Sequence, residues 1–193
     1  MKLYCVEFFI RALHRLIHHP ALRSSNDGKS GNVIHPTSYF GKSALTVTTD
    51  TVAELSHLLG AVTNHRGDAK FRLMTDKYLY ATSFGLGDET RFLEMAIILE
   101  MLLLPKNQQE LSYRFSLRMA NLAAAHIGEN IRDAFMAAKH IYRIRSNLVH
   151  SGRDKDVEKM LPRTLDYVRQ LLRVYLDNPD AFTDEALDNL CLK

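Results

Sequence analysis

The sequence predicts an all-α protein: an antiparallel, up-and-down helical bundle with an extra helix at its N-terminus. Apolar residues recur at helical spacing through most of the chain after residue 47. Glycine or proline separates the successive helical stretches, and these residues end helices for backbone reasons. Because the connections are short, neighbouring helices are expected to run antiparallel.

Residues 1–46 are expected to form an N-terminal amphipathic helix followed by a linker. Charged residues interrupt the segment Lys2–His19, so it lacks the roughly 18 apolar residues of a membrane span and the unbroken core of a signal peptide. Residues 24–46 are rich in Ser, Asn and Gly and lack helical periodicity, as in a loop. His14 and His18 have a spacing that can place two imidazoles on one metal, but no further ligands complete the set. No metal or other cofactor is predicted.

The bundle is predicted over residues 47–178, followed by a short acidic helix or tail over 179–193 whose carboxylates are expected to be solvated. Pro162 lies inside a helical pattern, where it removes a backbone donor. We therefore expect it in the first turn of the last long helix, after a separate turn at 154–160. The predicted helices span about 50–63, 68–82, 88–104, 108–127, 129–150, 154–176 and 183–191.

Composition restricts the kind of partner. The chain has 193 residues, with 25 Lys and Arg against 22 Asp and Glu. Its net charge of +3 is too small for a protein whose whole surface binds nucleic acid electrostatically. Any basic site must be local. Cys5 and Cys191 cannot form a disulfide framework or a closed zinc site, which indicates a cytoplasmic protein. No membrane association is expected.

The helix Ile131–His150 carries an arginine on a packable face. Steps of four and three residues place Arg145 on one face with Ile131, Phe135, Ala138, Tyr142 and Val149. Since a guanidinium keeps its charge, Arg145 must be paired or must line a crevice or interface. A second line, Arg143, Asn147 and His150, is wholly polar and leads to Gly152, where the helix can end.

Arg145 and His150 together suit phosphodiester chemistry. The guanidinium can bind phosphate oxygens in a fork, and imidazole can exchange a proton with an RNA 2′-hydroxyl or a departing 5′-oxygen, without a metal. On an ideal helix, however, these two residues point about 140° apart. They can converge if the last turn unwinds near Gly152, or if two chains pack around a two-fold axis. This geometry predicts a homodimer.

The stretch Tyr142–Gly152 resembles the signature of HEPN domains, an arginine followed after four to six residues by a histidine, in the form typical of the Apea-like branch. Asp88, Arg91–Leu93 and Leu99–Glu100 resemble the first long core helix of that branch, and Glu110–Arg118 resembles the next helix. The resemblance covers about residues 68–176. It implies an antiparallel bundle of four or five helices, usually dimeric, in which the motif helices of both chains face a shared cleft.

The resemblance also implies an activity, because many HEPN domains are metal-independent endoribonucleases that act as toxins or in anti-phage defence. Arg145 would then hold the scissile phosphate and His150 would perform acid-base catalysis. Active HEPN nucleases often have Asn, Asp or His directly after the motif arginine, where this chain has Ser146. The expected partners are RNA, a second copy of the chain and an antitoxin or defence-complex protein. Supporting or substrate-binding roles would fall to Asn147, Arg143, Ser146 and Tyr142.

Two alternatives stay open. A non-catalytic HEPN module would use Arg145 at an interface or ligand site within a defence or toxin-antitoxin complex. A purely structural motif would have His150 and Asn147 cap the helix end, with Arg145 paired to an acidic residue such as Glu100.

Overall fold

The structure, a computed structural model, describes residues 49–192 except 66, 84 and 105–109, with side chains from Ser56 onward. The predicted helix at Lys2–His19, its histidines and the linker 24–46 lie outside these residues. The described residues from Ala61 onward belong to one compact unit, which contains every residue of the candidate site.

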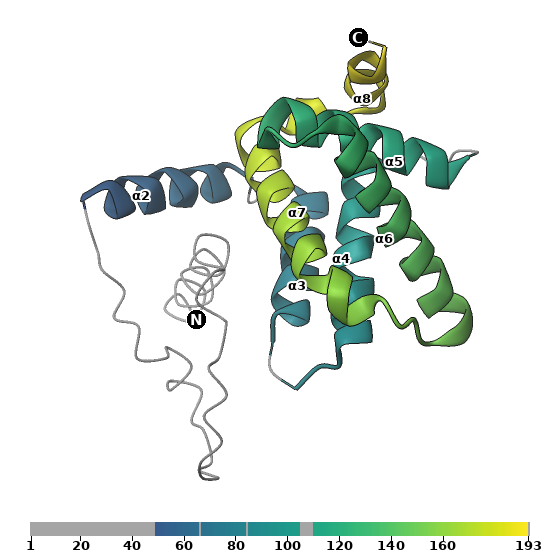
Figure 1. The fold of residues 1–193 in the computed structure, drawn as a ribbon. Coiled ribbons are helices and arrows are strands. Elements are labelled where there is room, and N and C mark those ends of the chain that lie inside the picture. Colours follow the sequence, from purple (N-terminus) through teal and green to yellow (C-terminus); the bar gives the residue numbers. More distant parts are fainter. Residues whose placement is uncertain (1–48, 66, 84, 105–109, 193) are drawn as a thin grey trace, which may run out of the picture. The chain divides into compact units, whose positions relative to one another are not determined.

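Every regular element in the described residues is a helix, which confirms the predicted all-α class (Figure 1). No helix there is long and apolar enough to cross a membrane. Each helix predicted after residue 47 is present, with ends shifted by a few residues. The elements are α2 (Thr49–Asn64), α3 (Ala69–Ala81), α4 (Asp88–Leu103), α5 (Leu111–Leu122) with a π-helical turn (Ala123–Ile127), α6 (Ile131–Ser151), α7 (Val157–Asp177), a 3-10 turn (Pro179–Phe182) and α8 (Asp184–Cys191).

Helix α6 begins and ends at residues suited to capping. Asn130 is its N-cap, and its side-chain oxygen accepts hydrogen bonds from the backbone N–H groups of Arg132 and Asp133 at 2.9 and 3.3 Å. At the other end Gly152 adopts a left-handed conformation with φ of 73°, as the sequence predicts for a glycine that stops a helix. The helix is therefore regular through His150 and Ser151.

Helix α4 lies at the centre of the core, where it packs against α3, α6 and α7. Its apolar residues point in nearly all directions, which is typical of a helix buried on most sides. The fully buried ones include Phe92, Met95, Ile98, Leu99 and Leu102. Because Glu100 belongs to the same helix, its carboxylate is held next to the core instead of in open solvent.

The core-facing side of α6 differs from the face that the sequence singled out. On that face only Ala138 is fully buried, while Ile131 and Val149 are 49% and 53% exposed. The buried stripe lies beside it and consists largely of small residues, which permit close packing between helices. It contains Ala134, Ala137, Ala138, Ile141, Ile144 and Leu148. The face containing Arg145 is thus the edge of the core, partly open to solvent.

The expectation for Pro162 is wrong, because α7 runs without a break from Val157 through Pro162 to Asp177. The missing proline N–H costs one backbone hydrogen bond near the start of the helix. Val157, Met160 and Leu161 are buried and pin this first part of α7 to the core. Their packing outweighs the lost bond, so residues 157–160 belong to α7 and only a short turn at 155–156 precedes it.

The acidic C-terminal helix is not simply solvated. Arg118 of α5 is 1% exposed, and its guanidinium nitrogens lie 2.9 Å from Asp184 Oδ1 and 2.7 Å from Asp188 Oδ1. The guanidinium also donates to the carbonyl oxygen of Leu103 at 2.7 Å. A buried charge needs such partners, so α8 closes over Arg118 and joins the compact unit.

Candidate functional site

Arg145 is paired with Glu100, the partner that the structural alternative named. Arg145 Nε lies 2.8 Å from Glu100 Oε1, and Nη2 donates to Oε2 at 3.0 Å, so the two groups face each other along one edge. The Arg145 side chain is 30% exposed. Its remaining terminal nitrogen, Nη1, has no hydrogen bond to any described residue. The guanidinium is therefore fixed on one side and open on another.

The Glu100–Arg145 pair lies in a partly dehydrated environment. Burial raises the pKa of the Glu100 carboxyl above its ordinary value, although the charge and hydrogen bond of Arg145 act in the opposite direction. Burial also raises the pKa of the Tyr142 phenol, and the negative charge of Glu100 adds to that effect. The Tyr142 ring packs against Phe115, with ring centroids 5.4 Å apart. Tyr142 thus lies between the ion pair and the α5 side of the bundle.

His150 is exposed at the end of α6 and makes no hydrogen bond or ion pair to any described residue. Since α6 stays helical through Ser151, the last turn does not unwind, and the first route to convergence with Arg145 is absent. Within one chain the two side chains leave the helix about 140° apart. Arg145 and His150 can share a site only through a second chain.

The polar line on α6 is divided between two roles. Asn147 Nδ2 donates to Asp154 Oδ2 at 2.6 Å, and Arg143 forms ion pairs with Asp154 and Asp156 at 3.2 and 2.5 Å. These contacts fasten the loop after Gly152 to the helix. His150 does not join them, so the structure does not contain the helix capping by His150 and Asn147 that belonged to the structural alternative. Asn147 holds the loop through Asp154 instead.

We call the contacts of Arg143 and Asn147 with Asp154 and Asp156 the loop anchor. Asp154 is at its centre, and only 3% of the Asp154 side chain is exposed. Burial alone would raise the pKa of its carboxyl, but hydrogen bonds from the Asp156 N–H and from Asn147, with the charge of Arg143, bring that pKa below its ordinary value. Asp156 also has a lowered pKa, chiefly because His140 hydrogen-bonds to its carboxylate at 2.9 Å. Both carboxylates are therefore stabilised in the charged form.

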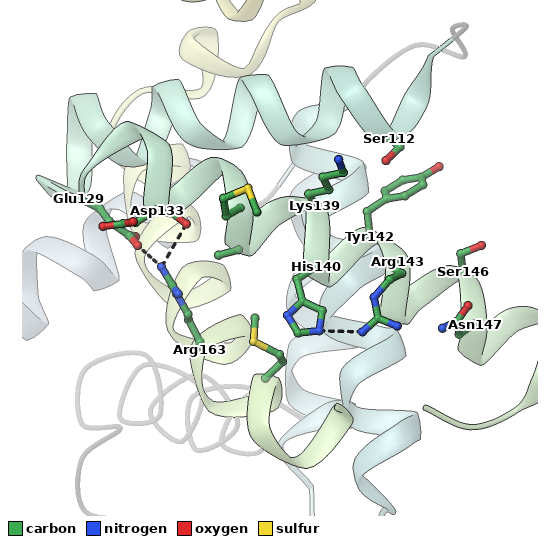
Figure 2. Close-up of a pocket in the computed structure, with 13 residues that line it drawn as sticks. Ser112, Glu129, Asp133, Lys139, His140, Tyr142, Arg143, Ser146, Asn147 and Arg163 are labelled. Carbon is green, nitrogen blue, oxygen red and sulfur yellow. Dashed lines mark hydrogen bonds and ion pairs between the residues drawn. The ribbon is translucent and has the colours of Figure 1, made fainter. Parts of the chain in front are cut away.

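An open groove of about 900 Å³ runs along the polar side of α6 (Figure 2). Lys139 and Tyr142 lie on the side nearest Ser112 of α5, while His140 and Arg143 point to the opposite side. Four predicted supporting residues line it, whereas Arg145 and His150 do not. The lining residues are Ser112, Glu129, Asp133, Met136, Ala137, Lys139, His140, Tyr142, Arg143, Ser146, Asn147, Met160 and Arg163.

The cations of this groove differ in how far they are neutralised. Arg163 is ion-paired with Glu129, and Arg143 is ion-paired with two aspartates. Lys139 is exposed and has no partner among the described residues. A ligand with negative charge would therefore meet Lys139 first. The described residues contain no cluster of His, Cys, Asp and Glu that could hold a metal ion.

Sequence reasoning missed Lys139, His140 and Arg163 as groove residues. His140 lies three residues before Arg143 and so extends the polar line of α6, a signal that the spacing already carried. Arg163 belongs to α7, and nothing in its local sequence indicates that it reaches Glu129. Asp154 and Asp156 follow the motif directly, but their pairing with Arg143 depends on how the loop folds back.

Comparison with protein-family models gave no match, and comparisons with curated proteins and with solved structures gave none either. The resemblance to HEPN domains therefore depends on the residues of this chain alone and stays a prediction.

Proposed function

We propose that this protein is a cytoplasmic HEPN-type endoribonuclease that cleaves RNA without a metal, at a site made by Arg145 of one chain and His150 of a second. The observation that carries the proposal is the state of Arg145: Glu100 lies within 3.0 Å of two of its nitrogens, while Nη1 has no partner among the described residues. A guanidinium held in this way is oriented before a ligand arrives, which favours binding of a phosphate.

In this mechanism the His150 imidazole takes the proton of an RNA 2′-hydroxyl as the 2′-oxygen forms a bond to phosphorus. The bond from phosphorus to the 5′-oxygen breaks, and the imidazolium gives the proton to the departing oxygen. Arg145 stabilises the negative charge that builds up on the phosphate oxygens. The products are a 2′,3′-cyclic phosphate and a 5′-hydroxyl. A role as a toxin or in anti-phage defence, with an antitoxin or defence-complex partner, follows from the same proposal.

The exposed edge of α6 supports the dimer. Ile131 and Val149 flank the Arg145 face at its two ends, and both are about half exposed. Tyr113 of α5 is 57% exposed and stacks edge-on against Phe135 of the same face, with centroids 6.2 Å apart. A second chain that covers this edge of α6 would remove these apolar side chains from water, which favours association.

The test is RNA cleavage by the purified protein in EDTA, with Arg145→Ala and His150→Ala. His126→Ala is a matched control, since His126 is also an exposed histidine at the end of a helical segment. We expect the wild type and His126→Ala to produce 2′,3′-cyclic phosphate ends. His150→Ala should lose about 100-fold or more in rate. Equal RNA survival with wild type and with no protein would contradict the proposal.

The second candidate is a non-catalytic HEPN module that uses the same exposed edge for a partner or ligand. The ion pair between Arg145 and Glu100 favours it, because a guanidinium whose charge is already paired is also suited to an interface. Under this proposal Arg145→Ala weakens dimerisation or partner binding, measured by sedimentation velocity, while RNA stays intact in every preparation.

A further inference from the structure

One side of α6 carries polar side chains that form no hydrogen bond or ion pair with the part of the chain that the structure describes. We define the α6 stripe as Lys139, Tyr142, Ser146 and His150, which follow one another at steps of three, four and four residues. On a regular helix these positions fall within about 80° of each other. Lys139, Ser146 and His150 make no side-chain hydrogen bond or ion pair with any described residue.

The neighbouring polar groups of α6 are occupied. Arg143 is ion-paired with Asp154 and Asp156, and Asn147 donates to Asp154. Removing these contacts to bind a ligand would leave the buried Asp154 carboxylate with only the hydrogen bond from the Asp156 backbone N–H, which is costly. Arg143 is therefore an anchor of the loop and is poorly suited to the substrate-binding role that the resemblance to HEPN domains implies.

Charge favours an anion along the stripe. No Asp or Glu occurs from residue 134 to residue 153, whereas Lys139, Arg143, Arg145 and Arg153 fall in this interval. Arg153 lies just beyond Gly152 at the His150 end; its side chain is exposed and has no partner among the described residues. An unpaired cation thus lies near each end of the stripe.

We infer that a single strand of RNA lies along the α6 stripe, with Lys139 and Arg153 each contacting a backbone phosphate on either side of His150. The inference rests on the proposed function and extends it by naming the substrate path. Two unpaired cations bind successive parts of a polyanion, and the half-buried Tyr142 ring between Lys139 and Ser146 offers a face on which a base can stack. Figure 2 shows Lys139, Tyr142 and Ser146 on the groove.

Binding can be measured apart from cleavage with a fluorescent 2′-O-methyl RNA of mixed sequence, which lacks the 2′-hydroxyl nucleophile. The probe's fluorescence anisotropy is followed against wild-type protein at several salt concentrations. For single strands, the slope of log affinity against log salt changes by about 0.7 for each phosphate contact. Lys139→Ala and Arg153→Ala should each make the slope shallower by about 0.7, and the double variant by about 1.4.

Arg72→Ala serves as the control, because it removes an exposed cation on α3 that has no side-chain partner among the described residues. This variant should keep the wild-type slope, and thermal melts identify any variant that fails to fold. A slope for Lys139→Ala and Arg153→Ala equal to that of Arg72→Ala would overturn the proposed path and favour a protein partner for the stripe. The same would hold if the probe did not bind.

The cleavage assay in EDTA separates the two proposals. If wild-type protein cleaves RNA but Lys139→Ala and Arg153→Ala keep the wild-type salt slope, the RNA path is rejected and the ribonuclease proposal stands. If both variants have a shallower salt slope but the wild type does not cleave ordinary RNA, the ribonuclease proposal is rejected and the RNA path stands.

Discussion

Both carboxylate oxygens of Glu100 on α4 face the guanidinium of Arg145 on α6, with separations of 2.8 Å from Nε to Oε1 and 3.0 Å from Nη2 to Oε2. The two residues are 45 positions apart in the chain, so their meeting depends on the packing of α4 against α6. This contact fixes where Arg145 can present its remaining nitrogen.

Glu100 should therefore act as a positioning residue for Arg145. Glu100→Gln keeps the shape but removes the charge that aligns the guanidinium, and we expect kcat/KM for RNA cleavage to fall roughly 10- to 100-fold. The variant that also carries Arg145→Ala should be no slower than Arg145→Ala alone, because Glu100 acts through Arg145. Additive losses in this double-mutant cycle would show that Glu100 acts independently. Glu94→Gln is the matched control, because Glu94 also lies on α4 and forms an ion pair, in its case with Lys77 of α3.

Because of Asp154, the free energy of unfolding should decrease at acidic pH. Its pKa is lowered in the folded protein, so its contribution is fully present above the unfolded value of 3.8 and is lost as pH falls through the folded pKa. Asp154→Asn should cost about 2 kcal/mol at neutral pH and should flatten the decline in stability below pH 3.8. Urea unfolding at a series of pH values measures both. The exposed Asp76→Asn should change neither, and an acid limb unchanged by Asp154→Asn would count against the anchor.

The stability of the folded protein should depend on Asp184 and Asp188 of α8, because they pair with the buried charge of Arg118. Replacing Asp184 and Asp188 together by Asn leaves the Arg118 charge without an ionic partner, which we expect to cost about 3 to 5 kcal/mol. Adding Arg118→Met to the same variant should recover part of this loss, since no buried charge then remains. Urea titration measures each free energy of unfolding, with Asp180→Asn as the exposed control. Failure of Arg118→Met to recover stability would point to packing instead of charge.

Gly152 should be required for its backbone conformation alone. A Cβ at this position would meet no atom within 4 Å, but φ is +73°. Gly152→Ala should therefore cost about 1 kcal/mol through backbone strain without a steric clash. Gly67→Ala, which also meets nothing within 4 Å and has no positive φ, should leave the urea midpoint nearly unchanged. Equal effects of the two substitutions would contradict this explanation.

The sequence predicted the helices well because their signals are local. Asn130 and Gly152 mark the two ends of α6 by chemistry that needs no tertiary context. The prediction for Pro162 was wrong because buried Val157, Met160 and Leu161 compensate for the lost hydrogen bond, and burial is a property of the whole fold. The acidic tail was misjudged for a similar reason, since Arg118 lies about 70 residues earlier in the chain.

The candidate site was predicted only in part. Because burying an unpaired charge is costly, an acidic partner for Arg145 was one of the alternatives, and Glu100 was named as a candidate. The loop anchor was not foreseen, because Arg143 meets Asp156 only after the chain reverses at Gly152. Periodicity placed Arg143, Asn147 and His150 on one polar line of α6, but it did not show that the loop after Gly152 occupies Arg143 and Asn147.

The central claim is that Arg145 of one chain and His150 of another form one site, and mixing two inactive variants tests it directly. Arg145→Ala and His150→Ala proteins are unfolded together, refolded as a mixture and assayed for RNA cleavage in EDTA. Random pairing gives half heterodimers with one intact site of two, so about a quarter of the wild-type activity should return. If the mixture stays as inactive as either variant alone, although sedimentation shows that mixed dimers form, the shared site does not exist.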